Sequence, residues 1–249
     1  MQTNKLIAPL ACALALSGTT MVALAQETAP PATTTPATAA APTTEERIVA
    51  IKTHLAQSMQ NLKSYEWTET QVVNLKGEDK SNTQKSCYYG ADGKVVKTAV
   101  AAPAEDKGKP GLRGKIVENK KEEMGAYVKS AVALVKSYIP LDPARIQAAK
   151  DAGKVSISVL DPGKRARIDI KDYEKPGDNV GVEIDMTTNQ ILGLSVASYL
   201  ADAKDAVTLD VKMASLPDGT GFPSTIVLDG KAQQIKVTVS NSEYKKKAS

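Results

Sequence analysis

The sequence is poor in the residues from which most catalytic and metal sites are built. Two cysteines, one histidine, one tryptophan and one phenylalanine occur among 249 residues. This scarcity argues against a disulfide-stabilised scaffold, a zinc cluster and a Ser-His-Asp hydrolase. We expect His54 at the surface or beside the apolar stripe of a helix, and Cys87 as a small buried or half-buried strand residue. An intermolecular bridge or a reactive thiol is the alternative for Cys87.

Motifs for phosphate and dinucleotide binding are also absent, and the charge is nearly balanced. No P-loop and no Gly-rich dinucleotide fingerprint occurs, so we predict no cofactor. A formal net charge of +4 is too small to indicate a nucleic-acid partner. The acidic pairs fall at helix starts or on strand exteriors, where helix dipoles and solubility explain them, so we predict no enzyme. The basic ending 245–247 is expected to be a solvated tail, with a membrane surface as the alternative contact.

The first 25 residues have the pattern of a secretory signal peptide. A short start carrying Lys5 precedes the apolar segment 6–25, which ends in the small-x-small pattern Ala23-Leu24-Ala25. Cleavage after Ala25 would deliver the chain to the periplasm or outside a bacterial-type cell, whereas lipid attachment at Cys12 is the alternative. No later apolar run reaches the ~18 residues that a transmembrane helix needs.

The remaining chain divides into a linker and one domain. Residues 26–44 consist almost entirely of Pro, Ala and Thr, a composition that predicts a disordered tether. Residues 45–249 are of one-domain size and contain the amphipathic patterns described next.

Three helices are predicted. Thr43 and Glu46 form a capping box for a helix over 45–63, and its apolar stripe is Ile48, Ile51, Leu55, Met59 and Leu62. A second helix, 118–138, follows a Gly- and Pro-containing loop at 103–115 that we expect to be mobile. A third, short helix begins after Asp142, with Pro143 in its first turn, and ends at Gly153.

Alternating apolar and polar residues predict strands over the rest of the domain. They occupy 65–75, 82–89 and 94–100, and then nearly everything from Val155 onward, separated by turns rich in Gly, Pro, Asp and Asn. Because no βαβ alternation occurs, a Rossmann-type fold is excluded. We predict an α+β fold: a strongly curved antiparallel sheet (a half-barrel) with an N-terminal helix and inserted helices covering its concave face.

Three stretches carry a resemblance to a known family: 62–67 (Leu-Lys-Ser-Tyr-Glu-Trp), the hairpin 90–94, and 216–220 through 239–241. With the order of the elements, they make the chain similar to the periplasmic lipoprotein-carrier superfamily, the LolA/LolB-like incomplete β-barrels. The likeness covers most of residues 45–244. It implies helices that lie as a lid over the concave face, and a face that binds acyl chains and ferries them across the periplasm. Unlike those aromatic-rich carriers, this chain has one Trp and one Phe.

The predicted function is binding of a hydrophobic small molecule or lipid, without catalysis, inside the half-barrel. The alternative is a structural or interaction module of the cell envelope with a filled core, whose partner would be an envelope protein. The inward positions of the first strand, the second helix and the later strands are the expected ligand contacts: Tyr65, Trp67, Met124, Val128, Ala131, Val135, Ile184, Met186, Leu209 and Met213.

Overall fold

The computed structural model describes residues 44–100 and 112–247. The predicted signal peptide, the linker up to residue 43 and most of the predicted loop at 103–115 lie outside these ranges, so those expectations stay predictions. The described elements are α1 (Thr44–Leu62), β1 (Tyr65–Leu75), β2 (Glu78–Tyr89), β3 (Val95–Ala99), α2 (Leu112–Ser137), α3 (Pro143–Asp151), β4 (Val155–Asp161), β5 (Arg165–Lys171), β6 (Asn179–Asp185), β7 (Gln190–Tyr199), β8 (Ala206–Ser215), β9 (Gly221–Gly230) and β10 (Ile235–Lys246).

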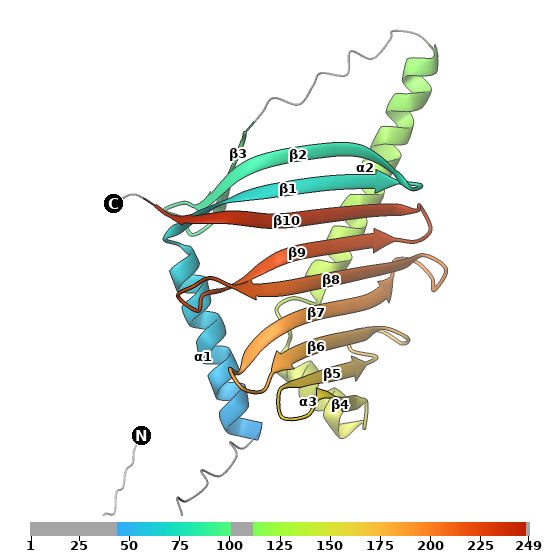
Figure 1. The fold of residues 1–249 in the computed structure, drawn as a ribbon. Helices are drawn as coiled ribbons and strands as arrows, with labels where there is room; N and C mark the ends of the chain where they lie inside the picture. Colours follow the sequence, from blue (N-terminus) through green and yellow to red (C-terminus); the bar gives the residue numbers. More distant parts are fainter. Residues whose placement is uncertain (1–43, 101–111, 248–249) are drawn as a thin grey trace, which may run out of the picture. The chain divides into compact units, whose positions relative to one another are not determined.

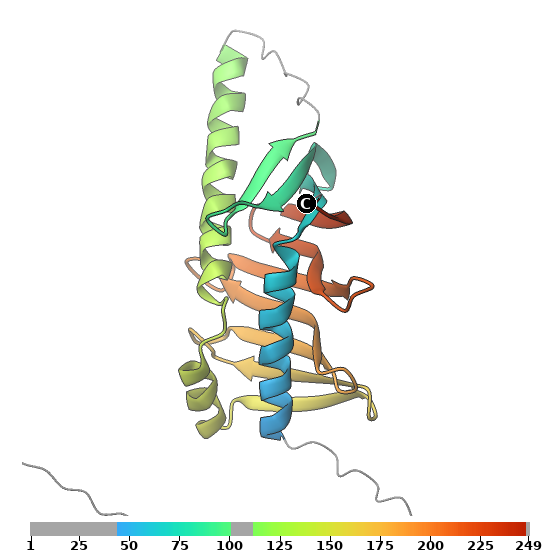
Figure 2. The same ribbon diagram turned by 90° about the vertical axis from the view of Figure 1, so that its left-hand side faces the viewer.

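All the strands join one open antiparallel sheet. The ten strands follow the order β3-β2-β1-β10-β9-β8-β7-β6-β5-β4, so β1 and the last strand lie side by side within the sheet while β3 and β4 form the edges (Figure 1). The helices lie on one side of this sheet (Figure 2). The predicted α+β half-barrel is therefore confirmed.

Three sequence-based boundaries were wrong. α2 begins at Leu112, so the end of the predicted loop is helical. β2 begins at Glu78, four residues earlier than expected, because the turn at Lys76 and Gly77 is tight and both residues have positive φ. β10 continues to Lys246, so the basic ending is part of the sheet and not a solvated tail.

Two parallel rows of apolar side chains cross the helix-covered face of the sheet. The register of the paired strands defines them, since residues two apart on a strand point to the same face. The core row is Val155, Ile170, Val180, Val196, Leu209, Leu228 and Val237. The open row lies two residues from the core row on each strand, alternately after and before it: Ile157, Ile168, Val182, Leu194, Val211, Ile226 and Val239.

The core row is covered by the C-terminal part of α2 and by α3. Ala131 and Val135 of α2, Tyr138 directly after it, and Ala149 of α3 are buried in one cluster with the central residues of this row. Burial of this apolar surface, at roughly 25 cal/mol per Å², is the main force that holds α2 and α3 on the sheet.

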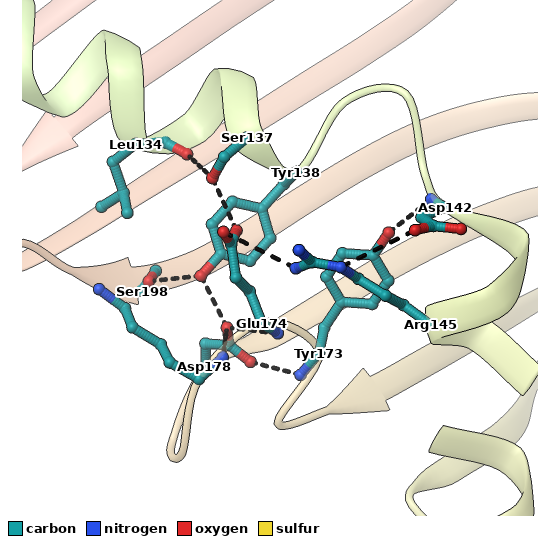
Figure 3. Close-up of polar contacts among 10 residues, drawn as sticks. Leu134, Ser137, Tyr138, Asp142, Arg145, Tyr173, Glu174, Asp178 and Ser198 are labelled. Atoms are coloured by element: carbon teal, nitrogen blue, oxygen red, sulfur yellow. Dashed lines mark hydrogen bonds and ion pairs between the residues drawn. The ribbon is translucent and has the colours of Figure 1, made fainter. Parts of the chain in front are cut away.

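A buried polar contact fixes where α2 ends on the sheet (Figure 3). The Tyr138 hydroxyl donates to Asp178 Oδ2 at 2.6 Å and lies 2.8 Å from Ser198 Oγ. The Asp178 carboxylate also accepts the backbone N–H groups of residues 173–175, which closes the β5–β6 turn. Burial, with the hydrogen bond to Asp178, raises the pKa of Tyr138 and keeps its hydroxyl protonated as a donor.

α1 is held by hydrogen bonds to the turns at the strand ends. Arg47 Nη1 donates to the Met186 carbonyl at 2.6 Å, and Ser58 Oγ accepts the Gly221 N–H at 2.9 Å. The turns involved connect β6 to β7 and β8 to β9, so α1 crosses several strands near one end of each (Figure 1).

The apolar stripe of α1 is largely uncovered in the described structure. Leu62 is buried, but Ile48, Leu55 and Met59 keep 47%, 42% and 59% of their surface exposed. The stripe predicted from the sequence therefore does not pack on the sheet along its whole length, because polar anchors on the neighbouring face of the helix make the contact.

Replacing Tyr138 by Phe tests the buried contact. The change removes one hydrogen-bond partner from each of the buried Asp178 and Ser198 oxygens, so we expect the free energy of unfolding to fall by about 1–3 kcal/mol. Tyr199→Phe is the matched control, because its hydroxyl donates to the Pro176 carbonyl at the surface and should cost less than ~0.5 kcal/mol. Equal losses in urea unfolding would contradict this role of Tyr138.

Candidate functional site

On β7, β8 and β9 the open row is less covered than the core row, whereas its residue on β6, Val182, is buried. Leu194, Val211, Ile226 and Val239 are half-buried, whereas their neighbours in the core row on β7, β8 and β9 are buried. The row continues on β1 with Gln71, which pairs with Val239. An apolar strip therefore crosses the sheet beside the filled core with part of its surface still accessible.

Helical geometry places the exposed stripe of α1 on the flank of the helix directed toward this strip. With about 3.6 residues per turn, Arg47, His54 and Asn61 lie on one side of Ile51 around the helix. These three bond to turn residues: Met186, Gly219 and Thr220 respectively.

Leu55, Ile48 and Met59 lie on the opposite side of Ile51. Ile51 and Leu55 line a small cavity with Ile191 and Met213, which lie on β7 and β8 between the open row and the turns. The uncovered stripe therefore faces away from the turns, toward the open row.

The cavity itself is too small for an organic ligand. Its volume is about 20 Å³, close to the space that one water molecule needs. An apolar ligand would have to lie along the open row and the flank of α1 instead of entering beneath the helix.

Tyr65 and Trp67 belong to an aromatic cluster formed by β1, β9 and β10. The Trp67 ring stacks on Tyr244 with centroids 5.6 Å apart, and Phe222 packs against Tyr244 at 4.3 Å. The Trp67 indole N–H donates to Asn241 Oδ1 at 3.2 Å. Both predicted residues are buried, so they hold β1 to β10 and do not line an accessible surface.

A short hydrogen bond ties Tyr65 to the β8–β9 turn. Its hydroxyl donates to Asp218 Oδ2 at 2.6 Å, which lowers the pKa of Asp218 to about 2. The predicted role of Asp218 in turn chemistry thus extends to fixing an aromatic side chain.

The other predicted contact residues separate into three groups. Ala131, Val135 and Leu209 are part of the filled core. Ile184 is buried at the turn-side end of β6, and Met186 follows it in the turn that anchors α1. Met124 and Val128 on α2, and Met213 on β8, are half-buried. The structure therefore does not bring the ten predicted residues into one pocket.

Toward β3 the inner face becomes charged. Glu69 on β1 is buried and forms an ion pair with Lys97 of β3. Cys87 lies between the same strands and is fully buried, as predicted, and burial together with the Glu69 carboxylate raises the pKa of its thiol. A protonated, inaccessible thiol fits packing better than the reactive alternative.

Sequence reasoning missed the accessible strip because alternation marks a strand's apolar face without showing which positions a helix will cover. Leu194, Val211 and Ile226 show the same alternation of apolar and polar residues as the buried residues beside them.

Within residues 44–100 and 112–247, no group of three His, Cys, Asp or Glu side chains is placed to hold a metal ion. In the same ranges no helix is long and apolar enough to span a membrane.

No protein-family model matches the sequence, and no curated protein does. Among solved structures, a LolA superfamily protein from Nitrosomonas europaea aligns with 80% of this chain and 94% of its own, at 7% identity and a TM-score of 0.35. A DUF1329 family protein from Desulfovibrio piger aligns with 80% and 94%, at 10% identity and a TM-score of 0.34. A lipoprotein-sorting domain from Vibrio parahaemolyticus aligns with 78% and 91%, at 10% and 0.33. The first of these belongs to the superfamily that the sequence resembles, and nothing about a ligand follows from likenesses this distant.

The position of α2 beside the open row depends on the packing of Tyr127 against a glycine. The Tyr127 hydroxyl donates to Asp205 Oδ1 at 2.8 Å, and its ring lies over Gly230, where an added Cβ would come within 2.5 Å of a ring carbon. Gly230→Ala should displace the ring and lower stability by about 1–3 kcal/mol. In a Tyr127→Ala background the same change should cost far less, as a double-mutant cycle by urea unfolding can measure. If the losses of the two variants simply add, the cost of Gly230→Ala does not arise from contact with the Tyr127 ring.

Proposed function

We propose that this chain is an exported protein that binds the acyl chain of a lipid or a similar linear hydrophobic molecule along the open row, without catalysing a reaction. The observation that carries the proposal is the facing pair of accessible apolar surfaces: the half-buried open row and the exposed stripe Ile48, Leu55 and Met59 of α1. Export follows from the signal-peptide pattern of residues 1–25. A periplasmic location is the expected destination.

The dimensions of the strip favour a linear ligand. From Leu194 on β7 to Val239 on β10 the accessible part of the open row crosses four adjacent strands, a span of about 14 Å at ~4.8 Å per step. Each methylene that a ligand buries there contributes about 0.8 kcal/mol. Met59 and Met213 supply flexible thioether side chains that adapt to chains of different shape.

The filled core row supports a second candidate. Its central residues leave no room for a ligand beneath α2, and the cavity under α1 is only about 20 Å³. A structural module of the envelope would have the same core, with the exposed stripe of α1 covered by an envelope protein. Binding measurements on α1 variants separate the two candidates.

Leu55→Glu and Val49→Glu form a matched pair for this test. Both positions are exposed apolar residues of α1, but Val49 lies on the side of the helix opposite the sheet. We expect Leu55→Glu to weaken binding of a fluorescent fatty-acid probe at least tenfold, because the carboxylate would face the ligand's hydrocarbon. Val49→Glu should leave the affinity unchanged.

Unfolding midpoints within a few degrees of the parent chain would show that both variants keep the fold. If the parent chain fails to bind the probe, or if the two variants lose affinity equally, the ligand-binding proposal is wrong. Loss of an envelope partner in the Leu55→Glu chain, without probe binding in the parent, would favour the structural module.

A further inference from the structure

The free edge of β4 lacks the features that usually protect a sheet edge. β5 is the only strand paired with β4 within residues 44–100 and 112–247. The segment from Val155 to Leu160 contains no charged residue and no proline, and Ile157 and Val159 each keep 67% of their surface exposed. Sheet edges are normally blunted by charge, proline or short length. The opposite edge, β3, follows that rule, since it spans only Val95–Ala99 and carries Lys97.

The backbone of β4 is arranged to pair with another strand. The Lys171 N–H donates to the Lys154 carbonyl, so these two residues form a hydrogen-bonded pair of the β4–β5 ladder. Because such pairs alternate along an antiparallel ladder, Ser156 and Ser158 also direct their backbone groups toward β5. Val155, Ile157 and Val159 therefore direct their N–H and C=O groups outward, at the free edge.

The strand is complementary to itself when it pairs antiparallel about Ile157. Ile157 then lies opposite Ile157 of the second copy, and Val155 lies opposite Val159, all on the apolar inner face. Ser156 lies opposite Ser158 on the outer face. This register joins every outward-pointing backbone group to a partner, and a twofold axis perpendicular to the sheet keeps the two inner faces on the same side.

The same register also pairs opposite charges. A bulge at Leu160 brings Asp161 into the position that follows Val159, as its pairing with Arg165 shows. Lys154 consequently lies opposite Asp161 of the second copy, once at each end of the interface. In the single chain these side chains meet Asp172 at 3.2 Å and Lys164 at 3.9 Å, in surface ion pairs that contribute little and can be exchanged.

We propose that the chain forms a twofold homodimer through β4, in the register centred on Ile157, so that two sheets join into one continuous antiparallel sheet. Occupation of the edge packs the exposed Ile157 against Ile157 of the second copy and the exposed Val159 against its Val155. It also continues the open row from one copy into the next. The dimer is independent of whether a ligand binds.

Disulfide trapping tests the register. Opposed residues in a hydrogen-bonded pair have Cα atoms about 5.5 Å apart, within the span that a disulfide bridges. In a full-length Cys12→Ser chain, Ile157→Cys should therefore cross-link to its copy on oxidation, while the native Cys87 stays buried and unreactive. Ser158→Cys is the matched control: it is equally exposed, but it faces Ser156 of the second copy and should cross-link at least tenfold less.

Sedimentation of the unmodified chain tests the assembly itself. The mass should double as the concentration rises. Lys154→Glu and Asp161→Lys should each weaken the dimer about tenfold by placing like charges opposite each other, and the double variant should restore it. Circular dichroism shows whether each variant keeps the fold.

Several results would overturn the proposal. One is a chain that stays monomeric at every concentration; another is equal cross-linking of the two cysteine variants. Species larger than a dimer would mean that the edge pairs with β3 of a neighbour instead. A dimer that forms only after deletion of residues 26–43 would mean that the chain's own linker covers the edge.

Discussion

The contact between Tyr138 and Asp178 determines how the rest of the described fold is arranged. It joins the end of α2, the β5–β6 turn and, through Ser198, β7, at a point that solvent does not reach. Because α2 is fixed there, its apolar face covers the core row and stops short of the open row two residues away. A tyrosine suits this position since its ring fills the core while its hydroxyl satisfies a carboxylate that is already bonded to three backbone N–H groups.

α1 and α2 are held on the sheet by different forces, and this difference creates the candidate site. α2 is fixed by apolar burial at Ala131 and Val135, whereas α1 is fixed by polar bonds from Arg47 and Ser58 to turns at the strand ends. α1 can therefore leave Leu55 and its neighbours uncovered without losing its place. An accessible apolar surface is retained beside a well-packed core, which is the physical requirement for binding a hydrophobic ligand without unfolding.

Much of the fold could be predicted from the sequence. Alternation located the later strands and the inner face, as at Ile184, and Asp142 and Pro143 marked the start of α3. The end of β10 was not predicted, because the charge of the basic ending indicated a solvated tail although Lys246 extends the strand. The candidate site was only partly predictable: helical periodicity found the stripe of α1, but which flank meets the sheet depends on hydrogen bonds to distant turns. Asp178 carried the signal of an ordinary turn residue, and only the fold shows it buried under Tyr138.

Saturable photolabelling tests the central claim most directly. A fatty acid with a photoreactive group in its chain, applied to the full-length protein and mapped by mass spectrometry, should label the α1 peptide that contains Leu55 and the β8 and β9 peptides that contain Val211 and Ile226. Excess unlabelled fatty acid should abolish the labelling. Labelling that is confined to residues on the outer face of the sheet, or that the unlabelled fatty acid does not reduce, would contradict the account.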